Sequence, residues 1–160
     1  MIKSFVTMTT ALSAALLLSV NAAAMTASQT VEVERQIKQP NGQVQIVTSP
    51  PDKVLPGDTL IYTVDFHNDK NETTDGFRID MPVPAEIIYL EGSAQRSDAV
   101  VLYSVDGGNN YQQRDQLTVR VAEGGTRSAV AEDITHIRWT LTNKVMPGDR
   151  GEIKFKGRLK

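Results

Sequence analysis

Two histidines, His67 and His136, are the side chains best suited to acid–base chemistry in this 160-residue sequence. A histidine base in a hydrolase activates a nucleophile held at a strained turn. Each histidine here instead occupies the polar phase of an alternating segment, next to Phe66 or Ile137. The sequence also contains no G-x-S-x-G, H-E-x-x-H or phosphate-binding glycine pattern. We therefore expect structural or surface histidines and no enzyme activity, with a hydrolase as a remote alternative.

The polar loop 67–76 is the first candidate binding segment. Calcium takes about six to eight oxygen ligands, and an EF-hand loop presents them at fixed alternate positions that end in glutamate. The acidic residues of this region do not have that spacing, and we expect them to be solvated, with a calcium site as an alternative: Asp65, Asp69, Glu72 and Asp75. Because the loop is long and polar, His67, Asp69 and Asp75 are binding candidates.

The second candidate binding loop is 106–111. It belongs to the segment 104–111, which has the form S-x-D-x-G-x-x-aromatic that occurs in the Asp-box hairpins of sialidases and other propellers. In those hairpins the aspartate caps its own turn and the aromatic ring packs beneath it. One copy cannot build a propeller, so the pattern predicts a structural turn. Asp106 and Asn109 are the binding candidates from this loop.

Composition excludes several classes of protein. The chain has no cysteine, which rules out thiol catalysis, disulfide scaffolds, Cys-ligated zinc and iron–sulfur clusters. A net charge of −2 argues against a nucleic-acid binder, and 40% apolar residues argue against a disordered chain. We expect one folded domain without a cofactor.

The first residues have the order of a secretory signal peptide. A short basic head at 1–3 precedes an apolar run at 11–20, and small residues follow. The apolar run is too short to span a bilayer comfortably. We expect cleavage after Ala24, with three other possible positions: Ala22, Ala23 and Ala27. The protein is then exported to the periplasm or the extracellular space and has no membrane span after cleavage.

Period-two alternation dominates the rest of the chain and predicts strands. The clearest segments are 60–67, 77–81, 117–121, 136–141 and 152–159, with weaker ones at 31–37, 43–48, 87–90 and 100–105. The best helical segment, 127–133, provides one or two turns at most. About seven to nine short strands predict an all-β, antiparallel immunoglobulin-like β-sandwich with Trp139 in its core. We divide the chain into a signal peptide (1–24), an N-terminal extension with one or two strands (25–51) and the sandwich (52–160).

A Pro-Gly-Asp turn precedes two of the strong strands, at 56–58 and at 147–149. Proline presets φ at the second turn position, and glycine accepts a positive φ at the third. The two copies are about 90 residues apart, too far for one repeat unit. We expect the same turn at two strand starts rather than a duplicated domain.

Several segments together resemble the bacterial conserved-repeat family called domain of unknown function eleven. The similar segments, in order, are 56–68, 81–85, 88–93, 103–111, 135–139 and 146–148, and the resemblance covers about residues 52–160. It implies an immunoglobulin-like sandwich in exported or cell-surface proteins, and no catalytic residue. The chain departs from the family at Met81, where an acidic residue is frequent, and in the long segment 68–76, which replaces a short corner.

The last strand carries a basic stripe of alternating residues: Lys154, Lys156, Arg158 and Lys160. The stripe is typical of a solvated face, or of an edge strand whose charges prevent pairing with another chain. Contact with an anionic partner is the alternative. We expect a non-catalytic interaction or structural module of the bacterial cell envelope, with an envelope or secreted protein as partner. A carbohydrate-binding module is an alternative, for which only three tyrosines are left outside the expected core: Tyr89, Tyr103 and Tyr111.

Overall fold

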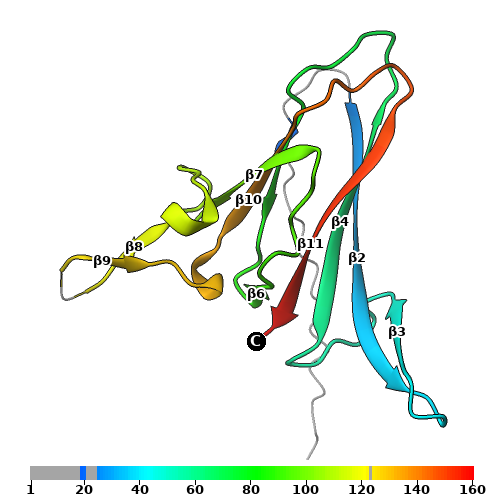
Figure 1. Ribbon diagram of the computed structural model, residues 1–160, viewed down its shortest axis with the longest axis vertical. Helices are drawn as coiled ribbons and strands as arrows, with labels where there is room; N and C mark the ends of the chain where they lie inside the picture. Colours follow the sequence, from blue (N-terminus) through cyan, green and yellow to red (C-terminus); the bar gives the residue numbers. More distant parts are fainter. Residues whose placement is uncertain (1–18, 21–24, 123) are drawn as a thin grey trace, which may run out of the picture.

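The computed structural model describes residues 19–20, 25–122 and 124–160. The fold is an all-β sandwich of antiparallel strands, which confirms the predicted fold class (Figure 1). One sheet has the strand order β1-β5-β10-β7, and the other has the order β3-β2-β4-β11-β6. A two-stranded ribbon, β8–β9, projects to one side of the first sheet (Figure 1). Most of the predicted signal peptide lies outside the described residues.

The strand bounds follow the predicted alternation closely in most places. The first sheet contains β1 (Ser19–Val20), β5 (Arg78–Pro82), β10 (His136–Leu141) and β7 (Ala99–Ser104). The second contains β3 (Val44–Ser49), β2 (Met25–Lys38), β4 (Thr59–Asn68), β11 (Arg150–Leu159) and β6 (Ile87–Tyr89). The ribbon is β8 (Thr118–Arg120) with β9 (Thr126–Ser128), and the 3₁₀ turns are η1 (Arg114–Gln116) and η2 (Ala131–Asp133).

One local expectation needs correction and another is met in part. The segment 117–121 forms only the three-residue strand β8, because its partner β9 is equally short and belongs to neither main sheet. The segment 127–133 contains the end of β9 and the single 3₁₀ turn η2, which agrees with the limit of one or two turns. Pairing of β8 with β9 makes the first residues of this segment extended.

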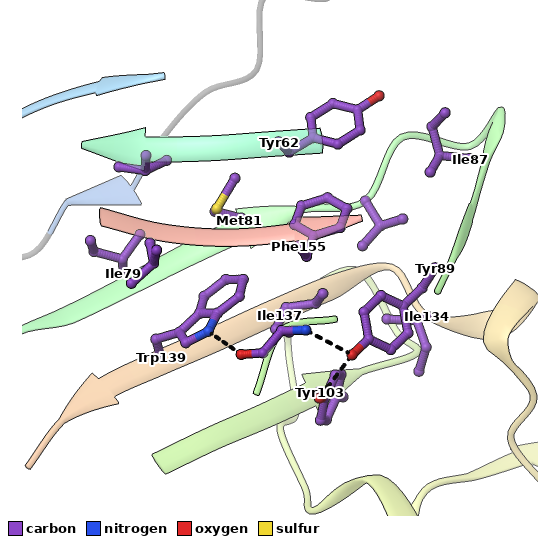
Figure 2. Packing of buried hydrophobic residues seen from close by; sticks show 14 of the residues in the cluster. Tyr62, Ile79, Met81, Ile87, Tyr89, Tyr103, Ile134, Ile137, Trp139 and Phe155 are labelled. Atoms are coloured by element: carbon purple, nitrogen blue, oxygen red, sulfur yellow. Dashed lines mark hydrogen bonds between the residues drawn. The ribbon is translucent and has the colours of Figure 1, made fainter. Parts of the chain in front are cut away.

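The core lies between the two sheets and is rich in aromatic side chains (Figure 2). Trp139 is 1% exposed, and its indole Nε1 donates a hydrogen bond of 2.8 Å to the carbonyl oxygen of Ala94. The rings of Tyr62 and Phe155 stack with centroids 4.8 Å apart. Burying so much apolar surface is the main stabilising contribution available to a chain without disulfides.

The segment 25–51 belongs to the second sheet. Strand β2 pairs with β4 from Met25 opposite Asn68 to Glu34 opposite Thr59, and its Val33 is fully buried. Strand β3 then pairs with the second half of β2. This segment supplies one internal strand and one edge strand, so the sheet continues across the boundary that the sequence placed at residue 52.

The two Pro-Gly-Asp turns have the same conformation, as expected. The φ angle is 93° at Gly57 and 85° at Gly148, a region that favours glycine. In each turn the aspartate side chain accepts the N–H of the residue before the proline, at 3.0 Å for Asp58 and 2.7 Å for Asp149. The turns precede β4 and β11, which are antiparallel neighbours, so they lie at opposite ends of the second sheet.

Candidate functional site

The outer surface of β2, β4 and β11 is rich in polar residues, and we call it the polar face. Alternate residues of β4 are buried, so the residues between them point away from the core. The register aligns these outward residues with those of β2 and β11 in five rows. The rows are Thr26–His67–Arg150, Ser28–Asp65–Glu152, Thr30–Thr63–Lys154, Glu32–Ile61–Lys156 and Glu34–Thr59–Arg158.

Two adjoining depressions lie along the polar face. The first, of about 660 Å³, is lined by the rows that contain His67 and Asp65. The second, of about 500 Å³, continues along the sheet towards Lys156 and Glu34. Both are lined by Asp65 and Glu152, so together they form one open trough.

Charges on the polar face are partly paired. Lys154 donates to Glu152 at 2.7 Å, and Lys156 donates to Glu34. Beyond the strand, the Lys160 ammonium donates to a backbone carbonyl. The predicted basic stripe is therefore largely matched by acidic or carbonyl oxygens. Strand β6 pairs with β11 only from Gly157 to Leu159, so Arg158 has a strand on both sides, whereas Lys154 lies where β11 pairs with β4 alone among the described strands. The edge-strand explanation therefore fails at Arg158 and fits Lys154, and a solvated face fits both.

The loop 67–76 is tied to the loop 142–149 by a buried side chain. Asn68 donates from Nδ2 to the carbonyl oxygens of Glu72, at 2.8 Å, and Val145, at 3.1 Å. Asp69 and Asp75 are exposed at the surface of this loop, and His67 belongs to the first row of the polar face. Of the predicted candidates, only His67 thus lies in the trough.

The loop 104–111 forms the structural turn that its pattern predicts. The Asp106 carboxylate accepts the N–H groups of Asn109, at 3.1 Å, and Asn110, at 3.0 Å, together with the hydroxyl of Ser104 at 2.7 Å. Hydrogen bonds from Asn110 and Ser104 lower the pKa of Asp106 to about 2. The candidate carboxylate is therefore engaged by its own turn.

The aromatic residue of this pattern packs on the outer surface of the first sheet. The guanidinium of Arg138 lies 3.6 Å from the ring centroid of Tyr111. Arg138 also makes two hydrogen bonds of 2.7 Å to the carboxylate of Asp80. A cation–π contact joined to a bidentate ion pair fixes the loop over β5 and β10.

The two candidate loops do not come together. The loop 104–111 begins beside the first residue of β10, because His136 pairs with Ser104. The loop 67–76 leads into β5 at the other end of β10, where Thr140 pairs with Arg78. At about 3.4 Å per residue, the length of β10 separates them by about 17 Å. One small ligand cannot contact Asp69 and Asp106 together.

Two of the three tyrosines left for a carbohydrate platform lie in the core. Tyr89 and Tyr103 are each 1% exposed, and their hydroxyls are 3.1 Å apart. Burial, helped by the hydrogen bond with Tyr89, raises the pKa of Tyr103. Tyr111 is half-buried against Arg138. The expectation that Tyr89 and Tyr103 are available outside the core is wrong, because their hydroxyls find buried partners (Figure 2).

Within the described ranges, no three histidine, aspartate or glutamate side chains gather in an arrangement that could hold a metal ion. In the same ranges, no helix has the length and apolarity needed to cross a membrane. Comparison of the chain with protein-family models, curated proteins and solved structures finds no match.

Sequence reasoning missed the polar face as a unit. The polar residues of 60–67 and 153–159 are visible in the alternation, but nothing local shows that these two segments are neighbours. The repeated Pro-Gly-Asp turn is the one signal that connects them, since each copy begins one strand of this pair. The contribution of β2 has no comparable signal.

Proposed function

We propose that this protein is a non-catalytic binding module of the bacterial cell envelope and that the polar face is its binding surface. The observation that carries the proposal is an open trough in which all outward residues except Ile61 are polar or charged. Ser28, Asp65, Glu152 and Lys154 remain exposed in it. The outer surface of the other sheet is partly covered by the Tyr111 loop.

The chemistry of the trough suits recognition of a polar partner surface. Strand β2 presents hydroxyls, β4 presents an imidazole and a carboxylate, and β11 presents basic groups beside Glu152. Such a face offers hydrogen-bond donors and acceptors as well as both signs of charge. Interfaces of transient complexes are about as polar as ordinary protein surface, and complementary charge gives them specificity.

The geometry around His67 supports a binding role over hydrolysis. Thr26, which lies opposite His67 in the same row, donates its hydroxyl to the carbonyl oxygen of His67 at 3.3 Å. The next hydroxyl along β2, that of Ser28, lies one row further on a regular strand. Hydrolases place the nucleophile at a strained turn that holds it beside its base. Among the described residues, none other than glycine has a positive φ. The face therefore lacks the backbone arrangement that activates a serine.

Export and envelope location rest on the leader-like residues 1–24 and on the resemblance to the bacterial conserved-repeat family. Both fit a module that acts outside the cytoplasm. An immunoglobulin-like assignment for the sandwich has the same basis. A partner that is itself an envelope or secreted protein follows from this location.

Reversal of charge in the trough tests the proposal. Changing Asp65→Lys with Glu152→Lys reverses both acidic positions of one row, and we expect at least a tenfold loss of binding to envelope fractions in co-sedimentation, about 1.4 kcal/mol. The double variant Asp115→Lys with Glu132→Lys changes net charge equally at exposed positions elsewhere and should bind like the wild type. Equal binding by both double variants would refute the assignment.

A further inference from the structure

Strand β3 is an edge strand without the usual protection. Its sequence, Val-Gln-Ile-Val-Thr-Ser, contains no charge and no proline, and it pairs on one side with β2. No other strand of the described chain pairs with its second side. Exposed edges in natural proteins are normally guarded by charges, prolines or bulges, because an open edge invites pairing with another chain.

The hairpin of β2 and β3 also projects beyond the rest of its sheet. Strand β4 ends its pairing with β2 at Glu34, so the hairpin continues past it (Figure 1). Val44 and Ile46 are exposed side by side on one face of this projection, at 58% and 59%. Ile37, at 47%, is exposed on its opposite face. Clustered exposed aliphatic residues are typical of a protein contact.

The free edge presents a defined set of backbone groups. The N–H of Gln39 donates to the carbonyl of Gln43 at 2.7 Å, so alternate residues of β3 counted from Gln43 direct their backbone groups towards β2. Val44, Ile46 and Thr48 therefore direct theirs outwards. All three can donate and accept, because the prolines begin only after Ser49.

We propose that β3 pairs with β3 of a second copy of this chain, antiparallel and around a two-fold axis at Ile46. In this register Ile46 lies opposite itself, and Val44 lies opposite Thr48 of the second copy. It is the register in which all three outward residues of each strand exchange both backbone hydrogen bonds. A two-fold contact of this kind uses the same patch on both chains.

Side-chain chemistry favours a second copy as the occupant of this edge. Two uncharged strands meet without like-charge repulsion, and Ile46 packs on its equivalent at the centre. Within each copy, Lys38 of β2 lies beside Val44 and Glu34 of β2 lies beside Thr48. Where Val44 of one copy pairs with Thr48 of the other, the row of four residues therefore begins with Lys38 of one copy and ends with Glu34 of the other. Charges of opposite sign therefore border the joined strands.

Pairing would also place two polar faces on the same side of one continuous sheet. A perpendicular two-fold axis keeps equivalent surfaces on the same side, so the two troughs face the same partner surface. Binding through both troughs at once raises avidity without any new contact. The pairing itself does not depend on the proposed function of the polar face.

The absence of cysteine makes the register directly measurable. Opposed Cα atoms in a hydrogen-bonded antiparallel pair are about 5.5 Å apart, within disulfide range. We expect the full-length Ile46→Cys variant to form a disulfide-linked dimer under mild oxidation. The matched Val44→Cys variant should not, because its two copies would lie about 14 Å apart. Val100→Cys, 50% exposed on the edge strand β7, should also remain unlinked.

Sedimentation of the cysteine-free protein supplies the second measurement. Ile46→Lys places like charges opposite each other and should raise the dimer Kd at least about tenfold, whereas Val100→Lys should leave it unchanged. Circular dichroism confirms that each variant is folded. Three outcomes would overturn the proposal. The wild-type protein could stay monomeric at high concentration, the disulfide could form through Cys at position 44 instead of 46, or a different protein could occupy the edge of β3.

Discussion

His136 shows how the position of a residue decides what its chemistry can do. Its ring packs beneath Gly108, where an added Cβ would meet the imidazole at 3.2 Å. The Nδ1 atom is buried, and no partner for it lies among the described residues. Burial lowers the pKa of His136 below its ordinary value of 6.5, against the opposing charges of Asp80 and Asp106. The alternation placed this histidine on the polar phase, but the loop that covers it comes from elsewhere in the chain.

The lowered pKa of His136 predicts a pH-dependent stability. The folded protein favours the neutral ring of His136. The contribution of this ring to the free energy of unfolding is therefore fully present above pH 6.5 and is lost as pH falls through the pKa of the folded state. We expect the free energy of unfolding to decrease more steeply from pH 7 to pH 5 in the wild type than in His136→Gln. Urea unfolding across that range measures the two slopes. A slope unchanged by the substitution, or an NMR titration midpoint above 6.5, would contradict the burial explanation.

Asp106 and His67 illustrate the two outcomes of sequence-based site prediction. The pattern around Asp106 predicted a capped turn, because serine, aspartate and glycine at that spacing can satisfy one another locally. The loop reasoning that selected His67 gave no information about its neighbours, because Thr26 and Arg150 belong to distant strands. Hydrogen bonds within one turn can be predicted from the sequence, whereas the neighbours of a residue on adjacent strands cannot.

At the scale of elements, the two Pro-Gly-Asp turns do more than begin strands. The N–H of Gly57 donates to the carbonyl of Leu159, and the N–H of Gly148 donates to the carbonyl of Asn68, both at 2.8 Å. Each turn therefore extends the ladder between β4 and β11 at one end. The strands that carry most of the polar face are thus aligned by the same device at both ends.

Two glycines in β11 provide room for bulky neighbours. A Cβ at Gly157 would lie 2.1 Å from Cγ2 of Ile87, and one at Gly151 would lie 2.4 Å from Cζ of Phe66. Neither glycine has a positive φ, so backbone conformation does not require them. They are required by close packing against β6 and β4.

Gly157→Ala tests this packing. We expect a loss of about 1–3 kcal/mol in the free energy of unfolding, because the new methyl group overpacks a buried position. Ile87→Ala removes the clashing Cγ2, so the double variant should be more stable than the sum of the single effects predicts. Lys154→Ala, on the exposed side of the same strand, should cost less than 1 kcal/mol. Additive effects of Gly157→Ala and Ile87→Ala in denaturant unfolding would argue against the clash.

At the scale of the whole molecule, the period-two alternation accounts for what could be predicted. It located β4, β5, β10 and β11 and placed Trp139 inside, because a strand with one buried face imposes that pattern. Strand order, the internal position of β2 and the separation of the two loops depend on long-range pairing. Long-range strand pairing has no signal in the local sequence, so the polar face could not be predicted before the order of the strands was known.

The central claim is that the polar face contacts another envelope protein. Site-specific photo-crosslinking in intact cells tests it most directly, with the probe at Thr63 in the middle of the face or at Thr140 on the outer surface of the other sheet. We predict a discrete adduct with another envelope protein from Thr63 and none from Thr140. Adducts from Thr140 alone, or no adduct from Thr63, would contradict the assignment of this face.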